Sequence, residues 1–354
     1  MNDAEVLPQN RPVARIDLTA IVNNCQVVRG LATGSRIMAV VKADAYGHGL
    51  PQVARAIAPW VDALAVARVA EAVELRKSDI GCDIVVLQGF TSRSELADCA
   101  VNHFLPVVHT ETQIRLMKEE PELPVWIKVD TGMHRLGLTS SRLQDVSPVL
   151  NVVGVMSHLA NSDQHDHPMN KAQLSELLSC ARGLGCPLSI ANSGAVLSLP
   201  ECHLDWVRPG IMLFGASADG REESRIREAM SLTAPVLSLQ SLRVGDSVGY
   251  GSTWKASEAC RIAVVGVGYA DGYPREIDGG EVQTAAGRRP IVGRVSMDML
   301  TILLREEDHL DVGDQVTLWG DGLSIREVVA WAGTVPYTLM TGLTGRVHRE
   351  YIEP

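Results

Sequence analysis

The sequence lacks three features that would tie it to a membrane, to secretion or to nucleic acid. It has no run near the ~20 apolar residues that a membrane-spanning helix needs, although hydrophobic residues make up 46% of it. It opens with MNDAEVLPQNRPVAR, which is polar and contains no apolar core of a secretion signal. Its net charge is −10, and it contains no block of basic residues. We therefore expect a cytoplasmic protein that binds neither nucleic acid nor a membrane.

The sequence also lacks cysteines at the spacing of a disulfide framework or a zinc site. Seven cysteines are scattered along the chain, and none belongs to a Cys-x-x-Cys pair. This pattern is typical of reduced thiols and not of a disulfide framework or a zinc site. The loop DQHDHP holds His165, Asp166 and His167, but adjacent residues of one polar loop lack the spacing of metal ligands. We predict no metal site.

What the sequence does contain is a series of short apolar segments. Its 354 residues are enough for two domains. Over the first part of the chain, apolar runs alternate with segments of helical spacing, among them 69–78, 110–120 and 169–185. Eight runs begin at residues 36, 61, 83, 103, 124, 152, 187 and 206. Such alternation indicates a parallel sheet covered by helices, and eight units favour a (β/α)8, TIM-like α/β barrel over an open sheet.

The pattern changes after residue 225. Segments such as APVLSLQSLRVGDSVGYGSTW (234–254) and RRPIVGRVSMDMLTILL (288–304) read as strands joined by turns rich in glycine and aspartate. VVAWAG (328–333) is a short helical insert. We therefore predict a barrel in residues 1–225 and a mostly β domain in residues 226–354.

Polar side chains follow the carboxyl ends of the predicted barrel strands, where the active site of a barrel lies. They include two lysines, a histidine and an arginine, which the ordinary polarity of a strand end explains poorly. The residues are Lys42, Gln88, Lys128, Asp130, His158, Asn192 and Arg208. We expect them to converge on one face.

Lys42 ends an apolar run in AVVKADAYGHG (39–49). A lysine at the mouth of an apolar barrel loses hydration, which lowers its pKa and frees the amine as a nucleophile. It could then form a Schiff base with a carbonyl substrate or with pyridoxal 5'-phosphate (PLP). On position alone, the alternative is a lysine that extends to solvent or pairs with Asp44.

Small polar turns near the same face could hold a phosphate group. Tyr46 stands beside a glycine, which lets the backbone approach a ligand while the phenol donates a hydrogen bond. The ANSGA motif offers the Ser193 hydroxyl and backbone amides. The VRPGIM motif adds the amides of Gly210 and Ile211.

Seven motifs together resemble the bacterial alanine racemase family, in the family's order and over essentially the whole chain. They are AVVKADAYGHG, VDTGMHRLG (129–137), SHLANSD (157–163), ANSGA, DWVRPGI (205–211), VGYGSTW (248–254) and VGRVSMD (292–298). The resemblance implies a PLP enzyme with a barrel and a C-terminal β domain. It also implies a homodimer with shared active sites that interconverts L- and D-alanine and supplies D-alanine for peptidoglycan.

The resemblance assigns two bases. Lys42 would carry the cofactor and act on one face of the substrate, and Tyr250 of the partner subunit would act on the other. Racemisation removes a proton from one side of a carbon and returns one to the other, which two fixed bases achieve without a swinging side chain. Tyr250 would need a cationic neighbour, because the unperturbed pKa of tyrosine is about 10.

The resemblance also implies the cofactor contacts at the phosphate. Tyr46, Ser193 with its neighbour Asn192, and the backbone of Gly210 and Ile211 would hold that group.

At the cofactor ring, Arg208 would face the pyridine nitrogen and His158 would lie against the ring. Because arginine keeps its proton, it leaves that nitrogen unprotonated and makes the ring a weaker electron sink. This discourages transamination and decarboxylation, which an acidic residue there would favour.

The substrate carboxylate would bind Arg135 and the backbone amide of Met297. Lys128 would be carbamylated and orient that arginine, or would instead form an ordinary ion pair with Asp130 or Glu122.

Tyr269 and Asp298 would line the entrance, and Tyr269 competes with Tyr250 for the role of partner-supplied base. Gly345 stands where some members carry a tyrosine that narrows the pocket, so the enzyme could also act on serine or another small amino acid. Three rival functions are those of a PLP amino-acid decarboxylase, a non-catalytic PLP-binding barrel, and a cofactor-free aldolase that uses Lys42 directly.

Overall fold

The structure is a computed structural model whose described residues are 11–217, 220 and 222–353. They form two compact units. One is Ala20–Arg227, and the other joins the described residues up to Thr19 to those from Glu228 onward. Most of the N-terminal stretch that was considered for a secretion signal lies outside the described residues.

The first unit is a closed barrel of parallel strands. β9 closes the ring by pairing with β2, with Val207 opposite Ile37. The predicted eight-stranded barrel is confirmed, because each strand lies inside one of the eight apolar runs. In order around the barrel, the strands are β2 (Arg36–Val40), β3 (Ala63–Val66), β4 (Ile84–Val86), β5 (Leu105–Val108), β6 (Val125–Lys128), β7 (Val152–Met156), β8 (Leu188–Ser189) and β9 (Trp206–Val207).

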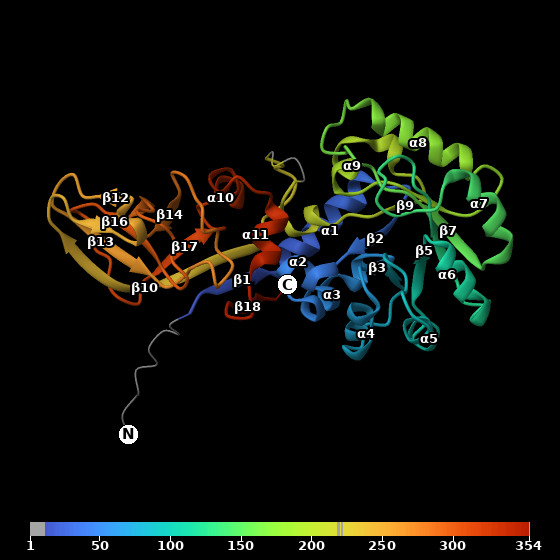
Figure 1. Ribbon diagram of the computed structural model, residues 1–354, viewed down its shortest axis with the longest axis horizontal. Helices are drawn as coiled ribbons and strands as arrows, with labels where there is room; N and C mark the ends of the chain where they lie inside the picture. The colour runs from blue at the N-terminus through green and yellow to red at the C-terminus, as the bar shows by residue number, and fades with distance from the viewer. Residues whose placement is uncertain (1–10, 218–219, 221, 354) are drawn as a thin grey trace, which may run out of the picture. The chain divides into compact units, whose positions relative to one another are not determined.

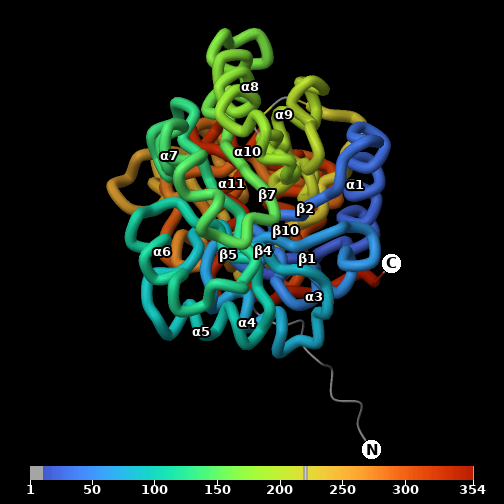
Figure 2. Tube along the Cα trace, turned by 90° about the vertical axis from the view of Figure 1, so that its right-hand side faces the viewer, coloured from blue at the N-terminus to red at the C-terminus, as the bar shows by residue number. Residues whose placement is uncertain are grey.

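Helices cover the outside of this barrel, as Figures 1 and 2 show for α3 to α8. The three segments whose spacing predicts helices correspond to α4, α6 and α8, and α8 begins one residue earlier than predicted. Ser92 and Thr110 begin α5 and α6 by accepting amide protons with their hydroxyl oxygens. None of the described helices has the length and apolar character that a membrane crossing requires. The helices are α1 (Leu18–Leu31), α2 (Lys42–Gly47), α3 (Leu50–Ile57), α4 (Val69–Lys77), α5 (Arg93–Val101), α6 (Glu111–Leu116), α7 (Ser140–Val146), α8 (Pro168–Cys180) and α9 (Ser193–Ser198).

The barrel strands are buried on both faces. All four residues of β3 are buried, and so are four of the five residues of β2. A parallel strand that lies between the barrel interior and a helix has no face for water, which is why its sequence shows no polar alternation. Polar side chains therefore enter only where a strand leaves the core, and this places them at the barrel mouth.

The second unit is a mostly antiparallel sheet with the strand order β15-β14-β17-β10-β1-β18, and β13 and β16 extend it from β10. Its strands are β1 (Val13–Asp17), β10 (Met230–Leu242), β13 (Cys260–Val265), β14 (Glu281–Thr284), β15 (Gly287–Pro290), β16 (Leu300–Leu304), β17 (Gln315–Trp319) and β18 (His348–Ile352). A small hairpin of β11 (Ser247–Val248) and β12 (Trp254–Lys255) and the helices α10 (Ile325–Ala332) and α11 (Pro336–Gly342) complete it.

The first strand belongs to this sheet and not to the barrel. β1 pairs antiparallel with β10 and parallel with β18, so the first and last strands of the chain lie side by side (Figure 1). The sequence-based division at residue 225 counted β1 with the barrel. Its short alternating pattern, with Ala14 and Ile16 buried, contains no sign of which distant strand it will join.

Candidate active site

Lys42 lies where β2 leaves the barrel core. The strand ends at Val40, and the buried Val41 bonds through its amide to the carbonyl of Ala65 at 2.8 Å. Burial lowers the pKa of the Lys42 amine, and the charge of Arg135 lowers it further, while Glu71 opposes the shift. The amine is therefore easier to deprotonate than that of an ordinary lysine. The Asp44 carboxylate, the alternative partner in the sequence, accepts the amide proton of Leu50 at 2.7 Å.

The segment after Lys42 forms a left-handed turn. Ala43, Asp44, Ala45 and Tyr46 all have φ between 51° and 55°. Each such residue costs roughly 1–2 kcal/mol relative to a right-handed conformation. The Glu71 carboxylate holds the turn by accepting the Ala43 amide at 2.7 Å. Strain of this kind persists only where the surroundings enforce it, and it is common at functional sites.

The turn brings Tyr46 against the segment that follows the last strand of the barrel. Its ring lies 4.9 Å from the ring of Phe214. Its hydroxyl lies so close to Gly210 that a Cβ atom there would come within 2.4 Å of it. Only glycine leaves room for this approach. The structure thus brings together two of the residues predicted to hold a phosphate.

Ser193 joins the same cluster from the start of α9. Its hydroxyl accepts the amide protons of Gly210 at 2.8 Å and of Met212 at 3.4 Å. Asn192 caps α9 by accepting the amide of Ala195 at 3.2 Å. Ile211 is buried and begins the short helical turn Ile211–Phe214. Backbone amides and a hydroxyl group therefore gather at one point, as a phosphate requires.

Arg208 lies across the barrel mouth and is only 5% exposed. Its guanidinium donates to the Ser189 hydroxyl, to the Ser157 carbonyl and, at 3.5 Å, to the Ile190 carbonyl. Burial lowers its pKa to about 10, which leaves it charged at neutral pH. Among the described residues, its hydrogen-bond partners include no carboxylate.

His158 is held neutral beside this arginine. Its Nδ1 lies 3.4 Å from a guanidinium nitrogen of Arg208. Although part of its surface is accessible, desolvation holds its pKa well below the usual value, and the charges of Arg208, Lys128, Arg135 and Lys42 add to the shift. A neutral ring can accept the Arg208 proton at Nδ1 and keep a proton on its other nitrogen.

Lys128 is the last residue of β6 and faces the same group of cations. Burial lowers its pKa to about 7, with further lowering from Arg208, Arg135 and Lys42. In the part of the chain that the structure describes, it forms no ion pair. Asp130 instead accepts amide protons from Gly132 at 2.9 Å and His134 at 3.0 Å. The ion-pair alternative for Lys128 thus has no support in the geometry.

Arg135 is exposed and lines one hollow together with Lys128 and His158. Two lysines and two arginines therefore surround the barrel mouth. A region with this charge favours ligands that carry several negative charges.

Of the remaining predicted residues, Gln88 follows β4 in the barrel unit, where its carbonyl accepts from Gln113 at 3.2 Å, and the others lie in the β unit. Tyr250 opens the short turn Tyr250–Ser252 and is 74% exposed. Tyr269 and Met297 lie on adjoining loops, because the amide of Tyr269 donates to the Ser296 carbonyl at 3.1 Å and that of Ala270 to the Met297 carbonyl at 2.9 Å. Both side chains are substantially exposed. These phenol and thioether groups are therefore accessible on this unit.

Arg346 ties these loops together and was missed by the sequence analysis. Its guanidinium lies 2.7 Å from the carboxylate of Asp298 and 3.1 Å from that of Asp271. Ser157 and Ser189, which accept from Arg208, were missed as well. These two groups accept hydrogen bonds from an arginine that is far away in the sequence, and such contacts leave no pattern in the local sequence.

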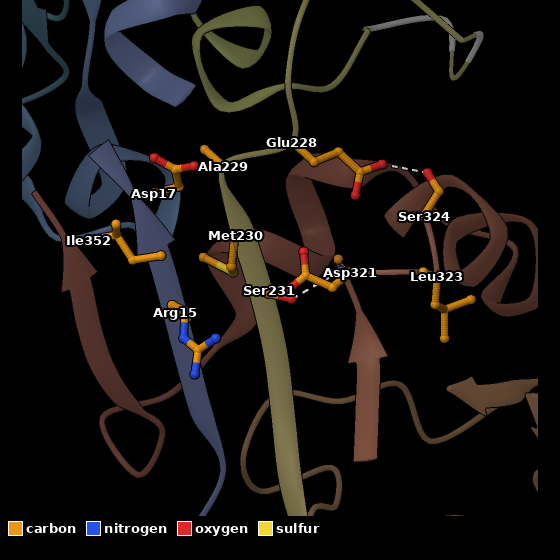
Figure 3. Close-up of a pocket in the computed structure, with 12 residues that line it drawn as sticks. Arg15, Asp17, Glu228, Ala229, Met230, Ser231, Asp321, Leu323, Ser324 and Ile352 are labelled. Atoms are coloured by element: carbon orange, nitrogen blue, oxygen red, sulfur yellow. Dashed lines mark hydrogen bonds between the residues drawn. The ribbon is translucent and has the colours of Figure 1, made fainter. Parts of the chain in front are cut away.

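Another hollow, of about 450 Å³, lies in the sheet of the β unit and contains none of the predicted residues (Figure 3). Glu228 points to Ser324, whose hydroxyl donates to it, and the Ser231 hydroxyl accepts the Asp321 amide at 3.1 Å. Burial raises the pKa of Glu228. Both the Glu228 carboxylate and the Ser231 hydroxyl are thus engaged within this unit.

The histidines of the loop at 163–168 bond to neighbouring groups. His165 pairs with Asp166 at 2.9 Å, and His167 accepts the amide proton of Met169. Within the described residues, no group of three or more histidine, cysteine, aspartate or glutamate side chains could hold a metal ion.

Comparison with known families accounts for both units. The alanine racemase N-terminal domain matches residues 16–218, and the alanine racemase C-terminal domain matches residues 229–351. The chain belongs to the alanine racemase family. A protein named alanine racemase from Nitrosococcus oceani is 44% identical over 354 aligned residues, which cover 96% of this chain and 99% of that one.

Solved structures of this family have the same fold. The biosynthetic alanine racemase of Pseudomonas aeruginosa superimposes with a TM-score of 0.91 at 39% identity, covering 98% of this chain and 100% of that one. The alanine racemase of Bartonella henselae, which was solved with covalently bound pyridoxal phosphate, gives a TM-score of 0.90 at 30% identity and covers 97% and 99%. The family resemblance drawn from the seven motifs is confirmed.

Proposed function

We propose that this chain is a cytoplasmic alanine racemase that uses PLP and supplies D-alanine for peptidoglycan. The observation that carries the proposal is the convergence of Lys42, Lys128, Arg135 and Arg208 at the barrel mouth, around a neutral histidine. This arrangement combines a nucleophilic amine with positive charge for a phosphate and for a substrate carboxylate.

The residues present fit PLP. Lys42 would hold its aldehyde carbon covalently, because the lowered pKa makes the amine available. The cluster of Tyr46, Ser193 and the Gly210 and Ile211 backbone would hold its phosphate. When bound, PLP withdraws electrons from the α-carbon of an attached amino acid and so acidifies the α-proton.

Arg208 would decide which reaction follows. Its charge and its fixed bonds to Ser157 and Ser189 leave it as a donor towards the pyridine nitrogen, with no carboxylate among its described partners. It cannot give that nitrogen a proton, which limits charge on the ring and favours racemisation over transamination or decarboxylation. This disfavours the decarboxylase alternative.

Proton transfer would involve one residue of each unit. The Nζ atom of Lys42 would remove or return the α-proton on one face of the substrate. The hydroxyl oxygen of the partner subunit's Tyr250 would do so on the other face, in a homodimer. The 74% exposure of this phenol supports its action outside its own sheet. Tyr269, which is 40% exposed beside Met297, would line the entrance with Asp298.

Substrate binding would rest on Arg135 and the Met297 amide. Lys128 would be carbamylated and orient Arg135, because an amine with a pKa of about 7 reacts with carbon dioxide and the product anion would be surrounded by cations.

Serine remains a second candidate substrate. A Cβ atom at Gly345 would meet nothing within 4 Å, and the tyrosine that some family members carry there would narrow the proposed site. The small side chain of the substrate would therefore be selected less strictly.

Circular dichroism of L-alanine solutions tests the proposal directly. With purified protein and PLP, the signal should decay to zero as the racemate forms. Borohydride reduction should then attach the cofactor to the peptide that contains Lys42. A signal that persists at stoichiometric enzyme would refute the proposed activity, and a label on another lysine would refute the role of Lys42.

A further inference from the structure

Gln173 is a buried glutamine on a helix that covers the outside of the barrel. It lies in the first half of α8 and is 0% exposed. A buried side-chain amide needs partners for its oxygen and for both of its hydrogens, because each unpaired group costs free energy. Its environment supplies all of them.

The partners of Gln173 belong to two loops of the barrel mouth. Its Oε1 accepts the amide proton of Ala160 at 2.9 Å. Its Nε2 donates to the carbonyl of His158 at 2.9 Å and to the hydroxyl of Thr131 at 3.2 Å. One side chain thus fixes the loop after β7 at two points and the loop after β6 at a third.

These contacts lead to the groups that face the proposed cofactor. The Thr131 hydroxyl bonds to the Ser157 hydroxyl at 2.7 Å, and the Ser157 carbonyl accepts from Arg208. The hydrogen bond that Gln173 donates to Thr131 therefore continues through this hydroxyl pair to Ser157. The same loop carries His158, whose Nδ1 faces Arg208, and the Thr131 loop continues to Arg135.

We propose that Gln173 is a positioning residue that holds His158 and Arg208 in the geometry that the cofactor ring requires. The inference rests on the proposed function, since it concerns the site at which PLP would bind. Gln173 is not a catalytic residue, because it reaches the site only through His158, Thr131 and Ser157.

The two hydrogens of the amide are both part of this role. A leucine would leave the Ala160 amide and the His158 carbonyl without Gln173 as their partner, and would leave the Thr131 hydroxyl with Ser157 alone. A glutamate would keep the acceptor for Ala160, but its carboxyl group, ionised or protonated, cannot donate to both the His158 carbonyl and the Thr131 hydroxyl.

A second buried glutamine of the same barrel provides a matched control. Gln113 is 4% exposed and donates to the carbonyls of Gln88 at 3.2 Å and Phe90 at 3.1 Å. It accepts the amide protons of His109 at 2.9 Å and Thr110 at 3.1 Å. It joins the loops after β4 and β5, which carry none of the proposed cofactor contacts.

The test compares Gln173→Leu and Gln113→Leu with the unmodified protein. Both variants should lower the melting temperature. Only Gln173→Leu should weaken the binding of PLP to the apoprotein, by about tenfold, which is ~1.4 kcal/mol. It should also lower kcat for alanine by about 10- to 100-fold, because small misplacements of a site cost that much. Gln113→Leu should leave both quantities within about twofold of the unmodified protein.

Gln173→Glu preserves the side-chain shape and serves if the leucine variant does not fold. It should also weaken PLP binding, because a carboxyl group, ionised or protonated, cannot donate to both the His158 carbonyl and the Thr131 hydroxyl. Losses of PLP affinity in the Gln173 variants no larger than that in Gln113→Leu would overturn the inference. The PLP measurement stands even if alanine is not racemised, so failure of the proposed function is recognised separately.

Discussion

At the scale of single residues, the site depends on amines that burial and mutual repulsion make easy to deprotonate. Lys42 and Lys128 both have lowered pKa values for these reasons, and His158 stays neutral. Which residues would meet could be predicted from the sequence, because the strand ends of a barrel converge. The hydrogen bonds of Arg208 to the Ser157 carbonyl and the Ser189 hydroxyl could not be predicted, since they depend on where the end of a long side chain lies.

Arg208 permits a prediction about which reaction occurs. Replacing it by glutamate should lower alanine racemisation by roughly 100-fold, because a fixed donor is lost from a buried site. The fraction of turnovers that end in pyruvate should rise, since an acidic partner protonates the pyridine nitrogen. A lactate dehydrogenase assay for pyruvate measures this. Arg208→Gln removes the charge without adding an acid and should not raise pyruvate, and a rise there would contradict this explanation.

Lys128 permits a prediction about pH. Its pKa is about 7 in the folded chain and returns to about 10.4 on unfolding. Between these values the unfolded state binds more protons, so this group makes the free energy of unfolding increase with pH there. Urea unfolding of the apoprotein in buffer free of carbon dioxide measures the slope. Lys128→Met should remove this contribution, and an identical slope in that variant would refute the shift.

At the scale of elements, the strands were predictable and the turn after β2 was not. Eight buried runs indicated the barrel because parallel strands covered by helices are apolar throughout. The left-handed turn 43–46 has no glycine at its four positions, so nothing in AVVKADAYGHG indicates it. Likewise, α11 was not predicted, because its seven residues are too few for a clear helical period.

The strain in this turn can be measured. Ala43 is exposed with φ 55°, so Ala43→Gly should relieve roughly 1–2 kcal/mol. Glycine loses about 0.5–1 kcal/mol of that through its greater freedom in the unfolded chain. The free energy of unfolding should therefore rise by roughly 0.5–1 kcal/mol. Ala97→Gly, at an exposed position of α5, should instead lower it by about 1 kcal/mol. If Ala43→Gly and Ala97→Gly lower the free energy of unfolding equally, the turn is not strained.

At the scale of the whole molecule, the predicted site residues divide between two units, with Lys42 in the barrel and Tyr250 in the β unit. The family resemblance connected them, whereas the sequence pattern alone could not. The pairing of β1 with β10 and β18 also escaped prediction, because strand partners far apart in sequence leave no local sign.

A shared site predicts complementation between inactive subunits. Lys42→Ala and Tyr250→Phe homodimers should each be inactive. After subunit exchange, a mixed dimer has one site with both residues intact, so up to about half of the activity per mixed dimer should return. Alanine racemisation measured before and after exchange checks this. If exchange is demonstrated and no activity returns, Tyr250 does not act across the subunit boundary.

The two-base claim is tested most directly by proton exchange in deuterium oxide with Tyr250→Phe. If Lys42 and Tyr250 serve opposite faces, one alanine enantiomer should gain deuterium at its α-carbon without inversion, because Lys42 removes and returns hydrogen on the same side. The other enantiomer should gain none. Proton NMR and chiral chromatography of both incubations would show this difference. Inversion of both enantiomers at the unmodified rate would contradict the account.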